Sequence, residues 1–248
     1  FWKDREFAPD IAFLRTPPYK EEKDYINLVG EVLEINGTET INQPASAEIC
    51  GNKILTKLRL EAQGIKSLKW ALVKSTANLD YAASSVEGYP LFLKTIYGTR
   101  GIGVVFCPCR ETLHASAQTL WAYNANVFAE EYAKESKGTT VRVLVANKKI
   151  IGAVKNIADT ENQDDLMTLR RSNFSRGGCI MPYEPDSEMR TTAVKACEAV
   201  GVKLAGVDFI ETASGWAVLE INSSPGIKGF EKAAGINAAK AILESFIA

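Results

Sequence analysis

Two short apolar segments near the C-terminus, each interrupted by a carboxylate, constrain this chain more than any other part of its sequence. They are residues 206–210 (Gly-Val-Asp-Phe-Ile) and 218–222 (Val-Leu-Glu-Ile-Asn), with a Ser-Gly turn between them. Such segments on either side of a turn predict a β-hairpin. If the turn is centred on Ser214, Asp208 and Glu220 each lie six residues from its centre and face each other across the two strands.

Oxygen-bearing side chains define one face of this predicted hairpin. Side chains alternate along a strand, so Asn222 shares the face of Asp208 and Glu220. The other face carries apolar residues that we assign to the core, namely Val207, Phe209, Leu219 and Ile221. Two carboxylates directly opposite each other repel unless a cation neutralises them. Two carboxylates and an amide suit a hard cation, so the pattern predicts a magnesium or manganese site; a solvated face with unpaired acids is the alternative.

A glycine-rich turn at 98–103 joins two predicted strands and follows Lys94. Glycines allow backbone N–H groups to approach phosphate oxygens closely. The spacing matches neither a Walker loop nor a dinucleotide-binding fingerprint, and a purely structural hairpin is an equal alternative. The polar stretch 170–178 carries three arginines, which suit phosphate oxygens, although a solvated surface loop fits the same composition.

Strands and helices are predicted in an order typical of an α+β protein. The predicted strands are 10–14, 69–74, 90–95, 103–107, 126–132, 140–145, 149–157, 205–211 and 216–222. The predicted helices are 25–36, 47–63, 111–121, 189–200 and 236–247. Because strands come in adjacent pairs with helices between the pairs, the order argues against a doubly wound parallel sheet.

The charge balance and the cysteines restrict the partners and the compartment of this chain. Basic residues number 29 and acidic residues 30, so there is no global reason to expect nucleic acid or an anionic membrane as a partner. No apolar run reaches the length of a membrane span. Five scattered cysteines and a single histidine favour reduced thiols in a cytoplasmic protein over a disulfide framework or a structural zinc site.

The order of these features resembles that of the ATP-grasp ligases, in particular the group that includes the ribosomal protein S6 modification enzyme, a glutamate ligase. The residues that carry the resemblance are, in order, Lys94, the glycine turn, Glu131-Tyr132, Arg171-Ser172-Asn173, Asp208, Glu220 and Asn222. The segment 220–226 (Glu-Ile-Asn-Ser-Ser-Pro-Gly) is similar to that group's Glu-x-Asn-x-x-Pro-Gly ending. The resemblance extends from about Asn42 to the C-terminus.

This resemblance implies an ATP-grasp fold, in which two α+β subdomains clasp ATP. Residues 46–125 would form the first subdomain with the glycine-rich loop, and residues 126–248 the second with the metal site. Residues 1–45 would be the remnant of an N-terminal domain that is otherwise largely missing. The chain begins with Phe1 rather than Met, so we expect the natural N-terminus to lie further upstream.

The same resemblance implies roles for individual residues. The nucleotide would be bound by Lys53, Lys94, Gly98, Thr99, Arg100, Gly101, Ile102, Gly103, Glu131, Tyr132, Arg171, Ser172 and Asn173. In that set the lysines contact phosphates, the glycine turn folds over them, and the Glu-Tyr pair lines the adenine pocket. Arg171 and Asn173 would face the reacting centre as catalytic residues, and Asp208, Glu220 and Asn222 would hold one or two magnesium or manganese ions.

Three positions depart from the usual pattern of the group. Thr140 stands where an acid usually contacts the ribose, and Asn52 precedes Lys53 where an aspartate is usual. Asn156 follows Lys155 where a phosphate-binding arginine is common, so either Lys155 supplies that charge or the contact is lost.

The implied activity is ATP-dependent ligation of a carboxylate and an amine through an acyl phosphate. An amino acid such as glutamate would be added to a carboxylate acceptor, which would be either a protein C-terminus or a small molecule. A phosphotransferase on the same fold and a non-catalytic ATP-binding regulatory module are the alternatives. The sequence does not identify the acceptor or the added amine, and it leaves a homo-oligomeric state open.

Overall fold

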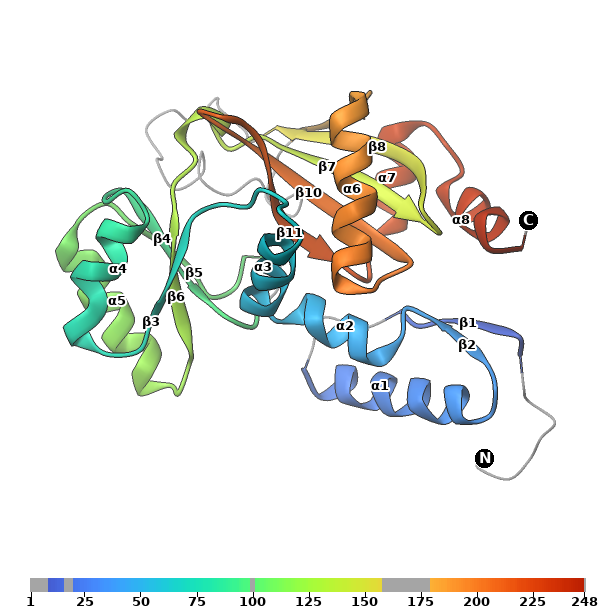
Figure 1. Cartoon of the computed structure of the whole chain (residues 1–248), viewed down its shortest axis with the longest axis horizontal. Helices are drawn as coiled ribbons and strands as arrows, with labels where there is room; N and C mark the ends of the chain where they lie inside the picture. Colours follow the sequence, from blue (N-terminus) through green and yellow to red (C-terminus); the bar gives the residue numbers. More distant parts are fainter. Residues whose placement is uncertain (1–8, 16–19, 99–100, 158–178, 248) are drawn as a thin grey trace.

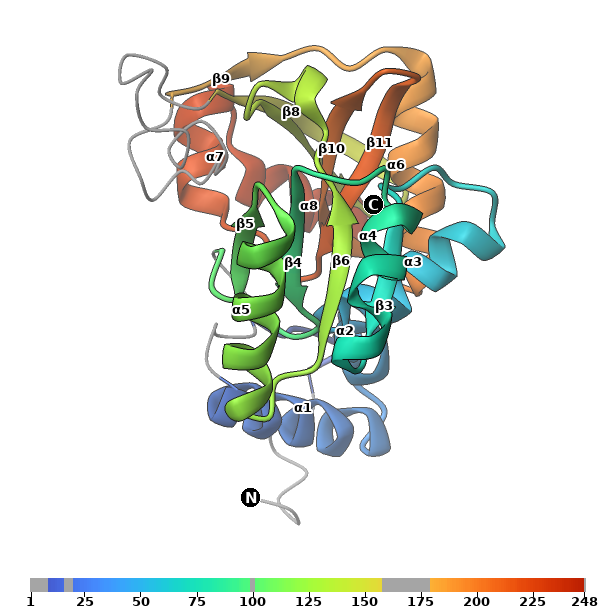
Figure 2. The same ribbon diagram turned by 90° about the vertical axis from the view of Figure 1, so that its left-hand side faces the viewer.

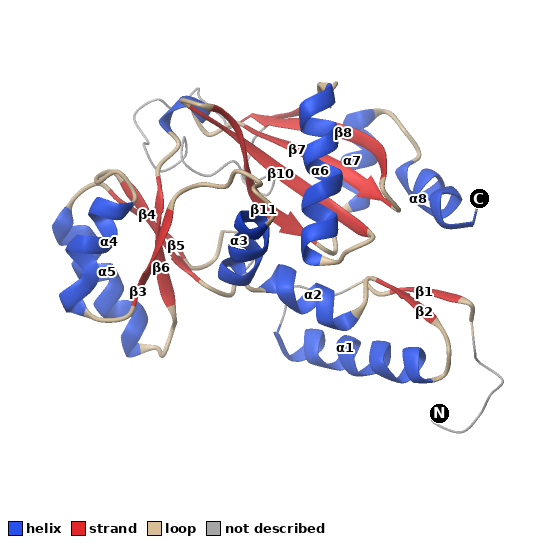
Figure 3. Cartoon of the chain, in the orientation of Figure 1, coloured by secondary structure: helices blue, strands red, loops and turns tan. Residues whose placement is uncertain are grey.

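The computed structural model of the chain describes residues 9–15, 20–98, 101–157 and 179–247. Two antiparallel sheets stand side by side, each with helices packed against it, and a small N-terminal unit lies below the larger sheet (Figure 1). Colouring by secondary structure separates the helical layers from the strands (Figure 3). The arrangement confirms the predicted α+β class.

The smaller sheet has the strand order β3-β6-β4-β5, and each neighbouring pair is antiparallel. Its strands are β3 (Trp70–Val73), β4 (Leu91–Thr95), β5 (Val104–Cys107) and β6 (Val127–Glu131). One face is covered by the helices α4 (Leu79–Ser85) and α5 (Arg110–Ala122), as Figure 2 shows. Leu91 and Leu93 are buried under these helices, so the alternating residues Phe92 and Lys94 project from the opposite face.

The larger sheet has the strand order β11-β10-β7-β8-β9 and is also antiparallel throughout. Its strands are β7 (Thr140–Ala146), β8 (Lys149–Ile157), β9 (Cys179–Tyr183), β10 (Leu204–Thr212) and β11 (Gly215–Asn222). The helices are α3 (Lys53–Ala62) and α6 (Ser187–Val200) on one face, with α7 (Ile227–Ala234) and α8 (Ala238–Ile247) on the other. Because both faces are covered, β7 is almost entirely apolar: Val143 belongs to the core under α6, and Leu144 to the core under α8.

Asn42 joins the N-terminal unit to the larger sheet through four hydrogen bonds. The unit consists of β1 (Ile11–Phe13), α1 (Lys20–Ile35), β2 (Glu39–Ile41) and α2 (Pro44–Gly51), with β1 and β2 parallel. Asn42 follows β2 and is 3% exposed. Its Nδ2 donates to the carbonyl groups of Leu204 at 2.6 Å and Ser223 at 2.9 Å. Its Oδ1 accepts from the backbone N–H groups of Lys203 at 2.8 Å and Leu204 at 2.9 Å, so the amide is fully satisfied.

The predicted helix at 47–63 is wrong as a single element, because the structure divides it into α2 and α3 at Asn52. The Asn52 side chain accepts hydrogen bonds from the backbone N–H groups of Ile54 and Leu55, both at 3.1 Å, and so caps α3. This local bond competes with continuation of the preceding helix, which explains the break. The cap makes Lys53 the first residue of α3.

Two β-strands, β2 and β9, and two α-helices, α4 and α7, have no counterpart among the predicted elements. The two strands have three and five residues and the two helices seven and eight. Segments of this length are too short to show a clear period of two or 3.6. In the part of the chain that is described, no helix has both the length and the apolar character needed to cross a bilayer.

The predicted division between residues 125 and 126 separates β6 from the sheet to which it belongs, because β6 pairs with both β3 and β4. The chain passes from the smaller to the larger sheet only after Glu131. Similarly, the division assigns α3 to the first subdomain, although α3 packs against α6 on the larger sheet. We therefore propose that the smaller-sheet subdomain ends after Glu131 and that α3 belongs with the larger sheet.

Replacement of Asn42 should lower the free energy of unfolding much more than replacement of an exposed asparagine. In Asn42→Ala, two N–H groups and two carbonyl groups lose their partner, so we expect the free energy of unfolding to fall by about 3 kcal/mol in urea denaturation. Asn36→Ala is a matched control, because the exposed Asn36 amide bonds only within its own helical turn, to the Val32 carbonyl, among the described residues. Equal losses in the two variants would contradict the role of Asn42.

Candidate active site

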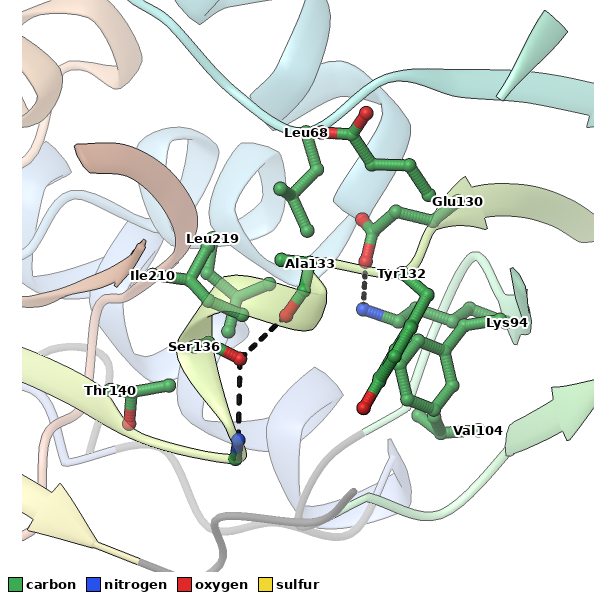
Figure 4. Close-up of a pocket in the computed structure, with 13 residues that line it drawn as sticks. Leu68, Lys94, Val104, Glu130, Tyr132, Ala133, Ser136, Thr140, Ile210 and Leu219 are labelled. Carbon is green, nitrogen blue, oxygen red and sulfur yellow. Dashed lines mark hydrogen bonds and ion pairs between the residues drawn. The ribbon is translucent and has the colours of Figure 1, made fainter. Parts of the chain in front are cut away.

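A cleft between the two sheets takes its walls from both of them (Figure 4). The smaller sheet and the residues flanking it contribute Leu68, Phe92, Lys94, Val104, Glu130, Glu131 and Tyr132. The segment after β6 and the larger sheet contribute Ala133, Ser136, Gly138, Thr140, Ile210 and Leu219. The cleft measures about 510 Å³ including its open mouth. The mainly apolar lining with a few charged groups is typical of small-molecule sites.

The β10–β11 hairpin brings the predicted metal-binding residues onto one face. Asp208 lies directly opposite Glu220, and Gly206 lies opposite Asn222, so the predicted pairing is confirmed. Because Asp208 and Gly206 are two residues apart on β10, their partners Glu220 and Asn222 point to the same side of the sheet.

The same hairpin corrects two details of the prediction. Thr212 pairs with Gly215, so the turn is centred half a residue before the predicted position. A β-bulge offsets this difference: Phe209 pairs with Val218, and Leu219 is the extra residue. Leu219 is therefore only partly buried: it packs against the small cluster of Leu68, Ala133 and Ala217 and also lines the cleft, whereas Val218 lies fully in the main core.

A row of three charges crosses the larger sheet at this level. Arg142 on β7 pairs in register with Asp208, which pairs with Glu220. Arg142 forms a bidentate ion pair with Asp208, with Nε–Oδ1 at 2.6 Å and Nη2–Oδ2 at 2.5 Å. The Asp208 carboxylate raises the pKa of Arg142 above its ordinary value. Asp208 is 5% exposed, so this pair satisfies a buried charge that would otherwise destabilise the fold.

Glu220 is the remaining carboxylate of this row, and it makes no ion pair within the described ranges. Its side chain reaches solvent, but the surrounding protein limits its hydration. This desolvation, followed by the neighbouring Asp208 carboxylate, raises the pKa of Glu220, whereas Arg142, Lys53 and Lys94 lower it. Because the Arg142 guanidinium group is paired with Asp208, the row carries one more carboxylate than cations.

The donors on this face fit a hard divalent cation. Asp208, Glu220 and Asn222 offer only oxygen, as magnesium and manganese prefer. The Asn222 Oδ1 accepts a hydrogen bond from the Ser224 N–H at 3.0 Å, which holds the amide in place. No cluster of three or more His, Cys, Asp or Glu side chains occurs among the residues that the structure describes. Such an ion would therefore need further oxygens from its ligand, such as those of a phosphate group.

Positive charge gathers on the wall formed by the smaller sheet. Glu130 is 1% exposed and is held between two lysines. Its Oε1 accepts from Lys57 Nζ at 2.9 Å, and its Oε2 accepts from Lys94 Nζ, the contact drawn in Figure 4. The Lys94 ammonium group also lies 5.6 Å from the centre of the Phe92 ring. Burial pushes the pKa of Glu130 upward, but the two ammonium groups outweigh it and hold that pKa below its ordinary value.

Lys53 connects the beginning of α3 to the glycine-rich turn. Its Nζ donates to the Gly98 carbonyl at 2.9 Å. Burial lowers the pKa of Lys53, an effect that the Glu220 carboxylate opposes. At the other end of the turn Gly103 has φ +74°, and a Cβ there would lie 2.2 Å from the Thr95 Oγ1, so only glycine fits. Lys53 therefore links the Gly98 end of the turn to the beginning of α3.

Tyr132 forms a flat apolar part of the cleft wall. Its ring packs edge-on against Phe92, with centroids 5.8 Å apart, and against Phe106, with centroids 5.6 Å apart. The preceding residue, Glu131, donates its N–H to the Lys69 carbonyl at 3.0 Å, and burial raises the pKa of its carboxyl group. Both residues line the cleft, where the sequence predicts the adenine pocket.

The remaining predicted residues fall into two groups. Thr99, Arg100, Arg171, Ser172 and Asn173 lie outside the described residues, so their roles stay predictions. Gly101 and Ile102 are described, and the Ile102 side chain is exposed. Two of the departures from the family pattern contact each other, because Asn156 Nδ2 donates to the Thr140 Oγ1 at 3.4 Å. Thr140 also lines the cleft.

Three charged residues of the site were not predicted from the sequence: Lys57, Glu130 and Arg142. Lys57 lies four residues after Lys53, a spacing that places both on one side of a helix and could have indicated its role. Arg142 interrupts an apolar strand, which indicates a partner but does not identify Asp208. The contacts themselves join segments far apart in the chain, so spacing alone does not reveal them.

Two antiparallel lobes, a mainly apolar cleft between them and a hairpin that carries opposed carboxylates are the features of an ATP-grasp enzyme. Residues 50–246 match the RimK-like ATP-grasp domain. The chain is 33% identical over 211 residues to a probable alpha-L-glutamate ligase of Chromohalobacter salexigens, a match that covers 85% of this chain and 68% of that protein. It is 30% identical over 223 residues to a probable alpha-L-glutamate ligase 2 of Pseudoalteromonas atlantica, with 90% and 72% covered.

Solved structures share the same fold. A RimK domain protein ATP-grasp from Sphaerobacter thermophilus superposes with a TM-score of 0.72 at 17% identity, over 96% of this chain and 82% of that one. A D-alanine–D-alanine ligase from Bacillus anthracis complexed with ATP gives a TM-score of 0.72 at 21% identity, over 96% and 78%. The chain belongs to the RimK-like ATP-grasp family and is an ATP-dependent ligase.

The lysine-bound Glu130 predicts a specific dependence of stability on pH. Its folded-state pKa lies below the unfolded value, so its contribution is complete above about pH 4.5 and is lost as the pH falls through the folded-state pKa. Glu130→Gln removes this titration. Urea denaturation at several pH values between about 5 and 3 should show a steeper loss of unfolding free energy in the wild type than in Glu130→Gln. Parallel curves of unfolding free energy against pH for the two proteins would contradict the lowered folded-state pKa assigned to Glu130.

Proposed function

We propose that this protein joins the amino group of an amino acid, specifically glutamate, to a carboxylate acceptor through an acyl phosphate. The acceptor carboxylate oxygen attacks the γ-phosphorus of ATP and ADP leaves. The amine nitrogen then attacks the acyl carbon, inorganic phosphate leaves and a proton is released. The names of the relatives, probable alpha-L-glutamate ligases, support glutamate as the amine.

One observation carries this proposal: the β10–β11 hairpin presents Asp208, Glu220 and Asn222 on one face, and the charges of Lys53 and Lys94 act on Glu220 there. Phosphoryl transfer needs positioning and charge neutralisation more than covalent help from the protein. A polyphosphate with a bound metal ion carries both signs of charge, so its cation would match the carboxylates and its phosphates would match the two lysines. The cleft beside this row supplies apolar walls, including Tyr132 and Leu219, for the flat base of the nucleotide.

Each group then has a definite task. Lys53 and Lys94 would bind the β- and γ-phosphates and orient the γ-phosphate toward the acceptor carboxylate. A magnesium or manganese ion held by Asp208, Glu220 and Asn222 would act as a Lewis acid that offsets the phosphate charge. The bidentate Arg142 pair fixes the Asp208 carboxylate, so its oxygens keep their orientation.

The acceptor is best sought first among peptides. A structure of the ATP-grasp ligase PsnB complexed with minimal precursor shares this fold, with a TM-score of 0.72 at 19% identity over 96% of this chain and 80% of that one. This supports a peptide or protein carboxylate as the first acceptor class to test, with small carboxylic acids as the second.

All five cysteines are free thiols, which supports a reducing compartment such as the cytoplasm.

Hydroxylamine, a small amine, should intercept the acyl phosphate. With ATP, magnesium and a suitable acceptor, the wild type should form a hydroxamate together with one ADP and one phosphate per product. Asp208→Asn should reduce this rate about 100-fold, because a neutral amide cannot replace the charge of a carboxylate at a divalent ion. Glu211→Gln, at an exposed acid on the same hairpin, is the matched control and should keep the wild-type rate.

Other products would contradict the ligase mechanism. A stable phosphorylated acceptor that yields no hydroxamate would indicate a phosphotransferase. ATP binding without ADP release across peptide and small-molecule acceptors would indicate a regulatory module.

Loss of the Lys94 ammonium group should weaken nucleotide binding without unfolding the protein. Lys94→Ala should raise the Kd for ATP about tenfold or more in titration calorimetry, because a charge-assisted contact to phosphate is removed. Lys74→Ala, at an exposed lysine beyond the end of β3, is the control and should leave the Kd unchanged. An unchanged Kd in Lys94→Ala would remove Lys94 from the site.

A further inference from the structure

Lys57 is a buried lysine that does not line the cleft. Its side chain is 3% exposed, and its ammonium group donates to Glu130 Oε1 at 2.9 Å and to the Leu68 carbonyl at 3.3 Å. A buried ammonium group is costly unless it is paired, so its presence here requires a reason. The other oxygen of Glu130 is bound by Lys94, which does line the cleft.

The charges of these three side chains do not cancel. Two ammonium groups share one carboxylate, so Lys57, Glu130 and Lys94 together carry a charge of +1. A cluster of Glu130 and Lys94 alone would be neutral, because the Glu130 carboxylate would offset the whole charge of the Lys94 ammonium group. Lys57 occupies one oxygen of Glu130, and Lys94, which lines the cleft, occupies the other.

We propose that Lys57 is a positioning residue that offsets the Glu130 carboxylate, so that Lys94 acts on the nucleotide polyphosphate with a full positive charge. Glu130 orients the Lys94 ammonium group by accepting its hydrogen bond. Lys57 offsets the charge of Glu130, so this hydrogen bond does not cancel the positive charge of Lys94. This inference rests on the proposed function, because it assumes that the anion bound at Lys94 is the phosphate chain of ATP. A purely structural role for Lys57, in packing α3 against β6, is the competing explanation.

Charge and packing predict different outcomes in a double-mutant cycle. Lys57→Met keeps most of the aliphatic stem but leaves the cluster neutral, so the Kd for ATP should rise about tenfold. The double variant Lys57→Met/Glu130→Gln restores the charge of +1 on Lys94 alone, so most of the lost affinity should return. If Lys57 serves only packing, the second substitution removes a further buried contact and the Kd should not recover.

The nucleotide itself provides an internal control. AMP lacks the β- and γ-phosphates, so Lys57→Met should raise its Kd much less than that of ATP. Lys148→Met, which removes a lysine from the exposed ion pair with Glu198, is the matched control and should leave both values unchanged. Thermal unfolding followed by circular dichroism confirms that each variant is folded before its Kd is interpreted.

The outcomes separate this inference from the proposed function. Failure of the wild type to bind ATP would refute the proposed function. ATP binding by the wild type with an unchanged Kd in Lys57→Met would refute the role of Lys57 alone. A folded double variant that binds ATP no better than Lys57→Met would also overturn it, in favour of packing. Recovery in the double variant, with AMP little affected, is the result that we expect.

Discussion

The bidentate ion pair between Arg142 and Asp208 determines where the other groups of this site can lie. β10 is placed between β7 and β11, so the pair joins the strand that carries the carboxylate to the middle of the larger sheet. Glu220 then stands opposite Asp208 as a consequence of the hairpin register. Without the guanidinium group, two adjacent carboxylates would repel each other across one rung of the sheet. When the Arg142 guanidinium group pairs with Asp208, one negative charge remains on Glu220, and a bound cation can neutralise it.

Two sets of charged side chains near the cleft have opposite net charges. The row Arg142, Asp208 and Glu220 has a net charge of −1, and the cluster around Glu130 has a net charge of +1. The cluster spans the two lobes, because Lys57 lies on α3, which packs on the larger sheet, whereas Glu130 lies on β6 of the smaller sheet. The surplus charges differ in sign, which suits a ligand that combines a cation with an anionic chain. A ligand that binds both sets at once gives a physical reason for a clasping fold.

The sequence predicted the hairpin more successfully than it predicted the rest of the site. The pairing of Asp208 with Glu220 was correct although the centre of the turn was wrong, because the bulge at Leu219 offset the shorter turn. No pattern of alternating residues reveals a bulge, so Leu219 was placed in the core. The cap at Asn52 was missed because the helical pattern continues through it. Ion pairs such as that between Lys57 and Glu130 depend on tertiary packing, which local spacing does not encode.

The N-terminal unit is more closely tied to the site than its description as a remnant implies. Arg15 Nη2 donates to the Pro225 carbonyl at 2.6 Å, and Asn42 Nδ2 donates to the Ser223 carbonyl. Both acceptors belong to the segment directly after Asn222, the amide ligand proposed for the metal. That segment leaves the end of β11 and has no strand partner of its own within the described ranges, so side chains from the N-terminal unit hold it instead. The geometry of the proposed metal site therefore depends on residues that precede the matched family domain, and the first part of the chain supports the face of the sheet that carries the proposed ligands.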